Sequence, residues 1–167
     1  SIRRQRQMCI RDRLCFDRDF AQVIRRCASA SRSGQKGTWI VPQMLDAYED
    51  LHRLGWAHSS EVWVGGQLVA GLYFVNLGHA VFGESMFTTI TDGSKMALTN
   101  LVSVCLQHGI KAIDCQQNTS HLASLGAREI PRSEFMVGIT QAMEGPAIDW
   151  RQQSLHWPAL HLSLIHI

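Results

Sequence analysis

The feature that most constrains the fold is a pair of glycines between two segments of alternating sequence. The period changes here from helical to strand-like, and we interpret Ser60 to Val64 and Gln67 to Asn76 as two strands that Gly65-Gly66 separates. Glycine accepts the positive φ angles of the tight turn between antiparallel strands, so the pattern predicts a β-hairpin. Ala80 to Thr88 follows after a short connection and is predicted as a third antiparallel strand. The centre of the chain is therefore expected to be an antiparallel sheet.

Helical periodicity precedes this hairpin. Phe20 to Cys27 places apolar residues at the spacing i, i+3, i+4 and i+7, and Asp17 or Asp19 can cap the start. Pro42 suits the first turn of a second helix, and Gly55 suits its end. The apolar stripe of that second helix consists of Leu45, Tyr48 and Leu51.

More helices and one strand follow the hairpin. A helix capped by Asp92 or Ser94 is expected to run to about residue 108. A short apolar strand over 110–115 comes next, followed by helices over 119–125 and around 134–143. Helices, an antiparallel meander and a helix that crosses to another strand are typical of α/β domains. We predict one α/β domain with a mixed, mostly antiparallel sheet flanked by helices.

Composition limits the kind of protein. The 167 residues are 46% hydrophobic and 18% charged, which suits one globular domain with a real core. No apolar run approaches the roughly 20 residues of a membrane span, and no secretory signal is visible. A cytoplasmic protein without membrane contact is therefore expected. The five cysteines lack CxxC spacing and the histidines lack HExxH spacing, so neither a metal nor a cofactor is expected.

The net charge of +2 is unevenly distributed along the chain. Residues 1–13 hold five arginines and one aspartate, so they carry +4 and leave −2 for residues 14–167. The body of the chain therefore has no overall basic character with which to bind a phosphate backbone.

Both ends of the chain resemble translated adapter sequence. Leu162 to Ile167, LSLIHI, is the translation of CTGTCTCTTATACACATC, and the reverse complement of that string, slightly extended, encodes MCIRD, Met8 to Asp12. These strings match a transposon end that is used to build sequencing libraries. We expect residues 1–13 and 162–167 to be non-native tails, and residues 14–161 to form the domain. The basic character of residues 1–13 would then carry no information on partners.

An acid and an amide stand at the end of the predicted strand over 110–115. If the extended conformation persists to Gln116, Asp114 and Gln116 project to one side, and Ile113 and Cys115 project to the other. Such a pair can hold a substrate and accept a proton. In the alternative interpretation the two residues cap the next helix or satisfy loop amides.

Two further residues are candidates for a binding site. Glu84 is expected to share one strand face with Phe82 and Met86, where a carboxylate needs a partner or a function. Alternatively, Glu84 lies on an edge strand and reaches water. Trp39 can serve as a stacking platform for a base, or it can belong to the core.

Five motifs taken together resemble one family. They occur in the order and at the separations of the C-terminal domain of bacterial leucyl/phenylalanyl-tRNA–protein transferases, over roughly 16–143. The motifs are GTWI (Gly37 to Ile40), LHRLGWAHSSEVW (Leu51 to Trp63), GESMF (Gly83 to Phe87), IDCQ (Ile113 to Gln116) and HLASLGAREIPR (His121 to Arg132). The resemblance implies a GNAT-like acyltransferase domain. It also implies transfer of Leu or Phe, and less readily Met, from aminoacyl-tRNA to proteins with N-terminal Arg or Lys, in the N-degron pathway.

The resemblance also implies roles for the candidate residues. Asp114 would orient the acceptor amine and relay its proton, and Gln116 would hold the ester or the developing oxyanion. Trp39 would lie near the terminal adenosine of the tRNA, and Glu84 beside the aminoacyl group. An apolar pocket for side chains unbranched at Cβ would be lined by Leu72 and Ile113.

Two other functions remain open at this point. The first is an acetyl-CoA-dependent GNAT enzyme, although Thr91-Asp92-Gly93-Ser94 offers only one glycine and an acid where such enzymes bind pyrophosphate. The second is a fragment that folds but is inactive alone, because the family has an N-terminal domain that receives the tRNA and has no counterpart here.

Overall fold

The computed structural model describes residues 14–30 and 40–160. The predictions for the two tails, for most of the loop before Ile40 and for Trp39 lie outside these residues. Five strands form one sheet in the order β1-β2-β3-β4-β5. The strands are β1 (Leu14–Phe16), β2 (Ala57–Val64), β3 (Gln67–Leu77), β4 (Ala80–Thr88) and β5 (Ile113–Asp114). The first four are antiparallel to their neighbours, and β5 pairs with β4 in parallel.

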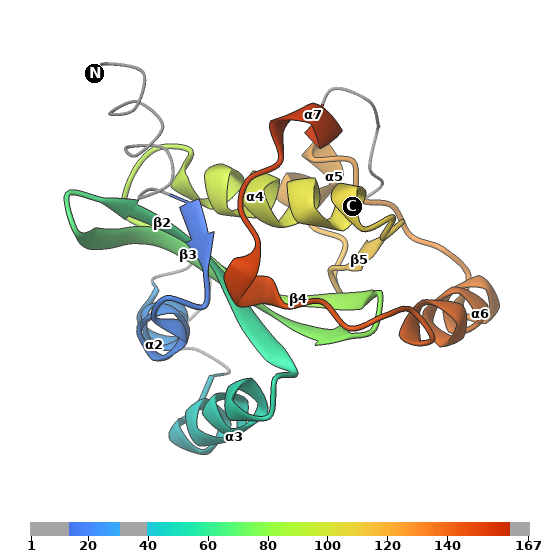
Figure 1. Ribbon diagram of the computed structural model, residues 1–167, viewed down its shortest axis with the longest axis horizontal. Coiled ribbons are helices and arrows are strands. Elements are labelled where there is room, and N and C mark those ends of the chain that lie inside the picture. The colour runs from blue at the N-terminus through green and yellow to red at the C-terminus, as the bar shows by residue number, and fades with distance from the viewer. Residues whose placement is uncertain (1–13, 31–39, 161–167) are drawn as a thin grey trace.

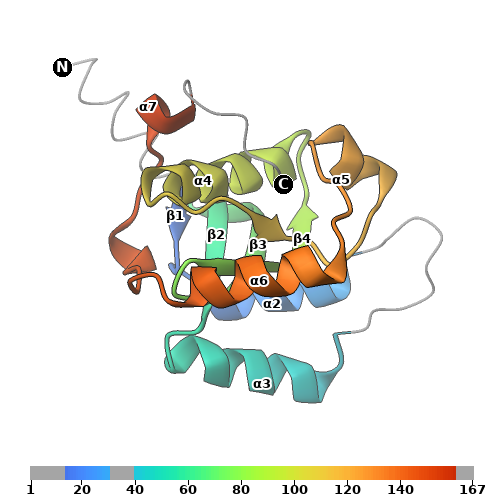
Figure 2. The same ribbon diagram turned by 90° about the vertical axis from the view of Figure 1, so that its right-hand side faces the viewer.

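Helices cover both faces of this sheet (Figures 1 and 2). On one face lie α2 (Phe20–Ser29) and α3 (Pro42–Arg53), and on the other lies α4 (Gly93–Gln107). The chain after β5 forms α5 (Ser120–Ser124), α6 (Arg132–Met143), the 3₁₀ turn η1 (Trp150–Gln152) and α7 (Trp157–Leu160). The predicted fold class, a mostly antiparallel α/β domain with flanking helices as in GNAT-like acyltransferases, is confirmed.

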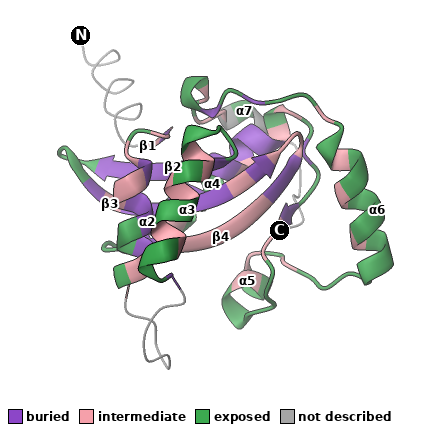
Figure 3. Cartoon of the chain, turned by 90° about the horizontal axis from the view of Figure 1, so that it is seen from below, coloured by how far each residue is buried: buried purple, intermediate pink, exposed green. Residues whose placement is uncertain are grey.

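Each sheet face has its own hydrophobic core. Under α4, strand residues such as Leu72, Phe74 and Val81 pack with Leu101 and Trp150. On the opposite face the packed side chains come from α2, α3 and the sheet, and include Phe20, Ile24, Tyr48, Trp63 and Tyr73. Figure 3 shows the buried residues concentrated in β2, β3 and α4, whereas α3 and α6 have none. The sheet is therefore buried on both sides, which makes the face that a side chain occupies decisive for its role.

Local signals in the sequence explain most element boundaries. Of the two predicted candidates, Asp17 and Asp19, the Asp19 side chain caps α2 by accepting from the Gln22 amide at 3.0 Å. Gly65 and Gly66 have φ angles of 58° and 77°, which a two-residue hairpin turn requires. Proline has no backbone N–H, and the first N–H groups of a helix have no partner within it, so α3 can begin at Pro42 without losing a hydrogen bond.

The structure differs from the prediction at both edges of the sheet. β1 was not predicted, because its three residues show no alternation of their own and are fixed by pairing with Ser60–Val62. The predicted strand over 110–115 contracts to β5, which pairs with β4 only through Ile113 and Asp114. None of the helices in the described ranges is both long and apolar enough to cross a membrane.

Candidate functional site

A carboxylate on β4 connects three separate segments of the chain. The Tyr48 hydroxyl of α3 donates a hydrogen bond to Glu84 Oε2 at 2.9 Å. The Gln116 side-chain amide, just after β5, donates to Glu84 Oε1 at 3.2 Å. Both oxygens of the acid are therefore held by side chains from different elements, which fixes the plane of the carboxylate.

A β-bulge determines the direction in which Glu84 points. The register between β3 and β4 shifts so that Tyr73 pairs with Ser85 while Phe74 pairs with Gly83, and Glu84 is the extra residue. Met86 packs against the core under α4, whereas Glu84 reaches Tyr48 on the opposite side. The prediction that Glu84 and Met86 share one face is therefore wrong, because the bulge interrupts the alternation.

Asp114 and Gln116 are brought together by a turn, not by an extended strand. Gln116 has a φ angle of 61°, so the extended conformation predicted to reach it ends at Asp114. The backbone amide of Gln116 donates to Asp114 Oδ1 at 2.8 Å. This contact is the alternative interpretation, in which the strand-end acid satisfies a loop amide. The Gln116 side chain is free of that turn and reaches Glu84 instead.

The predicted pocket residues lie in the core under α4. Leu72 is 3% exposed and Ile113 is 5% exposed, and both belong to the same cluster. Leu72 pairs with Met86 across β3 and β4, while Val81 pairs with Ile113 across β4 and β5. The structure thus places Ile113, Asp114 and Gln116 along one short segment beside β4.

The electrostatics of the site keep its hydroxyl and thiol protonated. Burial, followed by the hydrogen bond to Glu84 and its negative charge, raises the pKa of Tyr48 far above its ordinary value. Burial and the neighbouring Asp114 charge raise the pKa of the Cys115 thiol. Tyr48 therefore remains a hydrogen-bond donor to Glu84, and Cys115 does not become a thiolate nucleophile at neutral pH.

Comparison with known proteins identifies the family. The family model described as leucyl/phenylalanyl-tRNA protein transferase matches residues 1–140. This chain belongs to that family. Its curated relatives include the leucyl/phenylalanyl-tRNA–protein transferase of Polaromonas sp., 56% identical over 142 residues, which are 85% of this chain and 56% of that protein. The Albidiferax ferrireducens protein of the same name is 54% identical over 145 residues, 87% of this chain and 57% of the relative.

The match covers only part of each transferase. A third relative, from Paraburkholderia xenovorans, is 51% identical over 153 residues, which are 90% of this chain and 62% of that protein. The chain therefore spans a little over half the length of the transferases that it matches. The hypothesis that residues 1–13 and 162–167 are non-native stays a prediction.

The sequence analysis did not identify the roles of two residues, Tyr48 and Glu61. Tyr48 was interpreted as part of an apolar helix stripe, and only its hydroxyl, at the rim of that stripe, could have indicated a polar partner. Glu61, which is completely buried, was not considered either. Its carboxylate accepts from the Asp19 amide, the Ser59 hydroxyl and Trp63 Nε1 at 2.7–2.9 Å. These donors come from β2 and the start of α2, so Glu61 is a structural anchor between them.

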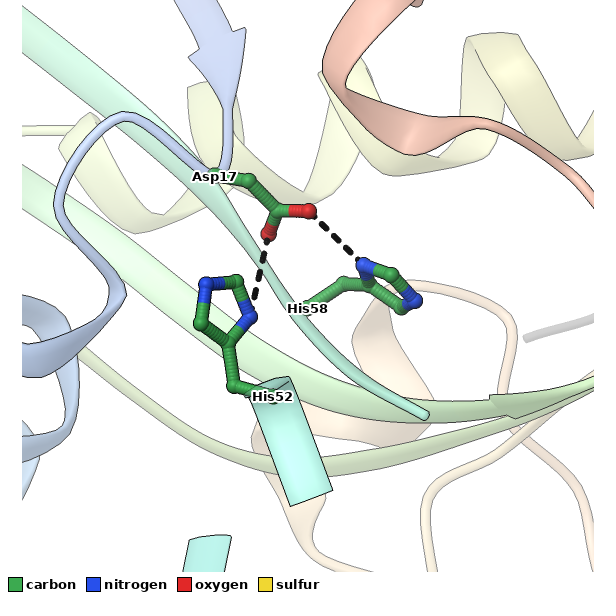
Figure 4. Close-up of side chains that lie close together, drawn as sticks. All are labelled: Asp17, His52 and His58. Carbon is green, nitrogen blue, oxygen red and sulfur yellow. Dashed lines mark hydrogen bonds and ion pairs between the residues drawn. The ribbon is translucent and has the colours of Figure 1, made fainter. Parts of the chain in front are cut away.

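Asp17, His52 and His58 form the one cluster within residues 14–30 and 40–160 whose side chains could together hold a metal ion (Figure 4). Their ligand atoms lie within 4.8 Å of one another. His52 Nδ1 already lies 2.7 Å from the Ala57 carbonyl, and His58 Nδ1 lies 2.7 Å from Asp17 Oδ2. Hydrogen bonds therefore account for this arrangement without a metal ion.

Proposed function

We propose that this chain is the aminoacyl-transfer part of a leucyl/phenylalanyl-tRNA–protein transferase. It would move Leu or Phe, and less readily Met, from aminoacyl-tRNA to the N-terminal Arg or Lys of acceptor proteins in the cytoplasm. Such transfer would mark the acceptors for N-degron-dependent degradation. The observation that carries the proposal is the contact between Glu84 and Gln116, beside Asp114, in a member of this family.

The proposed chemistry needs positioning more than a covalent intermediate. The aminoacyl ester is already activated, and the acceptor α-amine, with a pKa of about 8, is partly neutral at working pH. The amine nitrogen attacks the ester carbonyl, the new amide bond forms, and the C–O bond to the tRNA ribose breaks. The amine gives up one proton, and the departing ribose oxygen takes one.

Asp114 and Gln116 have free hydrogen-bonding capacity for these steps. Asp114 uses Oδ1 for the Gln116 backbone amide, so Oδ2 is the oxygen that would orient the amine and relay its proton. The side-chain amide nitrogen of Gln116 donates one of its two hydrogens to Glu84. Its second hydrogen would stabilise the developing oxyanion. Glu84, held by Tyr48, would keep this amide in orientation and lie beside the aminoacyl group.

The core under α4 supports the expected preference for apolar side chains. Leu72 and Ile113 belong to it, and Met86, Cys115 and Leu125 are partly buried against it. We propose that the aminoacyl side chain contacts the partly buried Met86, Cys115 and Leu125 first, and that the almost completely buried Leu72 and Ile113 form the inner end of its site. The role of Trp39 beside the terminal adenosine remains part of this proposal, on the resemblance alone.

The start of α4 argues against the acetyl-CoA alternative. A Cβ atom on Gly93 would lie 2.5 Å from Thr88 Oγ1 and 2.8 Å from Ala70 Cβ, so this glycine is needed for packing against the sheet. Asp92 adds a carboxylate at the helix start, paired with Lys95 at 2.7 Å. A pyrophosphate would meet a negative charge there and not an open row of amides.

A transfer assay tests the proposal. Because the chain spans about half of its relatives, it should be compared alone and joined to the part of a relative that it does not match. We expect the joined protein to transfer labelled leucine from Leu-tRNA to a peptide beginning with Arg, and the chain alone to transfer little. Asp114→Asn should lower the rate of the joined protein by about 100-fold, the scale of general acid–base contributions. Full activity of that variant, or transfer from acetyl-CoA, would overturn the proposal.

A further inference from the structure

A hollow in the surface lies away from the Glu84 site. It has a volume of about 470 Å³ and lies between α2 and the hairpin of β2 and β3. Its walls include Gln22 and Arg26 from α2, Trp63 and Gln67 from the hairpin, and Thr89 after β4. In Figure 1 the turn of this hairpin and the β5 segment lie at opposite ends of the sheet. The hollow is therefore separate from the site already described.

Two arginines, one in the wall of this hollow and one next to its wall residue Trp63, form none of the ion pairs found among residues 14–30 and 40–160. Arg26 lines the hollow, and Arg18 lies over the Trp63 ring at 4.2 Å from its centroid. Within the described ranges, neither guanidinium is among the ion pairs formed within 4.0 Å. The neighbouring Arg25 differs, because Glu49 pairs with it at 3.0 Å. The nearby Asp19 is engaged as the cap of α2. Arg18 and Arg26 thus place two positive charges near the hollow although residues 14–167 carry −2 in total.

The Trp63 ring is a fixed flat surface against which the Arg18 guanidinium lies. The indole Nε1 donates to the buried Glu61 at 2.7 Å, and Trp63 is only 7% exposed, so the ring is fixed. Arg18, whose guanidinium lies over that ring, is exposed. A guanidinium stacked on an aromatic ring presents its other face to solvent, and such planes stack on the bases of single-stranded nucleic acids.

We propose that this hollow binds a nucleotide unit of RNA. Arg26 contacts a backbone phosphate, the Arg18 plane stacks on a base, and the Gln22 and Gln67 amides hydrogen-bond to the ribose or the base edge. Groups that can bind a phosphate, a base and a hydroxyl lie close together here, so the surface suits a nucleotide of RNA better than a simple anion. The inference rests on the proposed function, since aminoacyl-tRNA is its donor, and it adds a contact surface remote from the reacting ester.

Binding of RNA by the chain itself tests this inference. The fluorescence anisotropy of an end-labelled, uncharged tRNA transcript would be measured against protein concentration at several KCl concentrations. Arg18→Gln and Arg26→Gln should each weaken binding by about tenfold. The Arg26→Gln change should also reduce the slope of log affinity against log salt by roughly 0.7 to 0.9, the value for one lost phosphate contact. All variants keep residues 1–13, so any contribution of those arginines cancels.

Arg25→Gln is the matched control, because it removes an equal charge from the same helix outside the hollow. It should change the affinity by less than about twofold, as expected of an exposed ion pair. Equal losses in all three variants would show charge alone and would overturn the inference, as would unchanged affinity in the Arg18→Gln, Arg26→Gln double variant or no RNA binding by the unmodified chain. If affinity depends on Arg18 and Arg26 but the joined protein transfers no leucine, the proposed function fails while this inference stands.

Discussion

Nδ1 of His58 lies 2.7 Å from Oδ2 of Asp17, and both side chains are buried. The second ring nitrogen of His58 lies 3.0 Å from the Gly55 carbonyl. The other Asp17 oxygen accepts from the Ser59 amide at 2.8 Å. Asp17 itself has a φ angle of 52°, which is unusual for a residue with a side chain. One acid thus joins the start of α2 to β2 and to the turn after α3.

Removing this acid should destabilise the fold. Asp17→Ala leaves the Ser59 amide and the His58 ring without their acceptor in a buried site, and we expect a loss of about 3 kcal/mol of unfolding free energy. Urea unfolding followed by circular dichroism measures the loss. Asp46→Ala, an exposed change on α3, is the control and should stay within about 0.5 kcal/mol. Similar midpoints for the two variants would contradict the anchoring role of Asp17.

Glu61 should make stability depend on pH with a defined sign. Burial raises the pKa of Glu61 above its ordinary value, although three hydrogen bonds oppose that rise and the Asp17 charge adds to it. The folded state therefore binds the Glu61 proton more tightly than the unfolded state does. Its contribution is complete below the unfolded pKa of about 4.3 and falls as the pH rises through the folded-state pKa.

Comparison with Glu61→Gln isolates this effect. The variant loses the titration and places an amide N–H against donors, which should cost roughly 1 to 3 kcal/mol. The stability advantage of the unmodified chain over Glu61→Gln should be largest near pH 4 and decrease toward pH 8. Urea midpoints at several pH values measure it. An advantage that grows with pH would show that the hydrogen bonds outweigh burial.

Tyr48→Phe should impair transfer with little effect on the fold. The change removes the donor to Glu84 Oε2 and keeps the ring that packs against Tyr73. We expect kcat of the joined transferase to fall about tenfold, the value of one hydrogen bond to a charged group. KM for aminoacyl-tRNA should remain nearly constant, because Tyr48 acts through Glu84. A change in KM alone would instead place Tyr48 in direct contact with the tRNA.

The Cys15 and Cys105 thiols of the folded chain should react slowly. Burial, then the Glu61 charge, raises the pKa of Cys15 to about 12, and burial raises that of Cys105 to about 12. At pH 8 both are therefore protonated and poor nucleophiles. Iodoacetamide labelling followed by peptide mass spectrometry should modify them at least about tenfold more slowly than in urea. Rapid labelling of Cys15 without denaturant would contradict the described packing.

Two glycine substitutions should have opposite effects. Gly93→Ala forces a Cβ against Thr88 and Ala70, so we expect a loss of about 1 to 3 kcal/mol. Gly138 lies in α6 with open space around its Cβ position. Gly138→Ala should stabilise the protein by roughly 0.5 to 1 kcal/mol, because alanine has the higher helix propensity. Thermal unfolding of both variants measures this, and a stable Gly93→Ala protein would refute the close packing of α4.

Much of the fold was predictable because local signals determine it. Gly65-Gly66 marked the hairpin and Asp19 marked the start of α2, and both effects involve residues close in sequence. The Glu84 bulge was not predictable, since it depends on how β4 aligns with β3. The same holds for Gln116, whose positive φ angle follows from the turn closed by Asp114. Sequence patterns indicated Glu84, Asp114 and Gln116 as candidates, but long-range pairing decided how these side chains meet.

The extra residue in β4 has one more consequence. In an unbroken ladder Glu84 would stand opposite Phe74 and point under α4, into the hydrophobic cluster that contains Phe74, Val81 and Trp150. The number of residues in β4, and not only their chemistry, thus decides on which face of the sheet the Glu84 side chain lies. Deleting Glu84 would leave Gly83 opposite Phe74 and Ser85 opposite Tyr73, so the sheet should tolerate this deletion while the contacts to Tyr48 and Gln116 are lost.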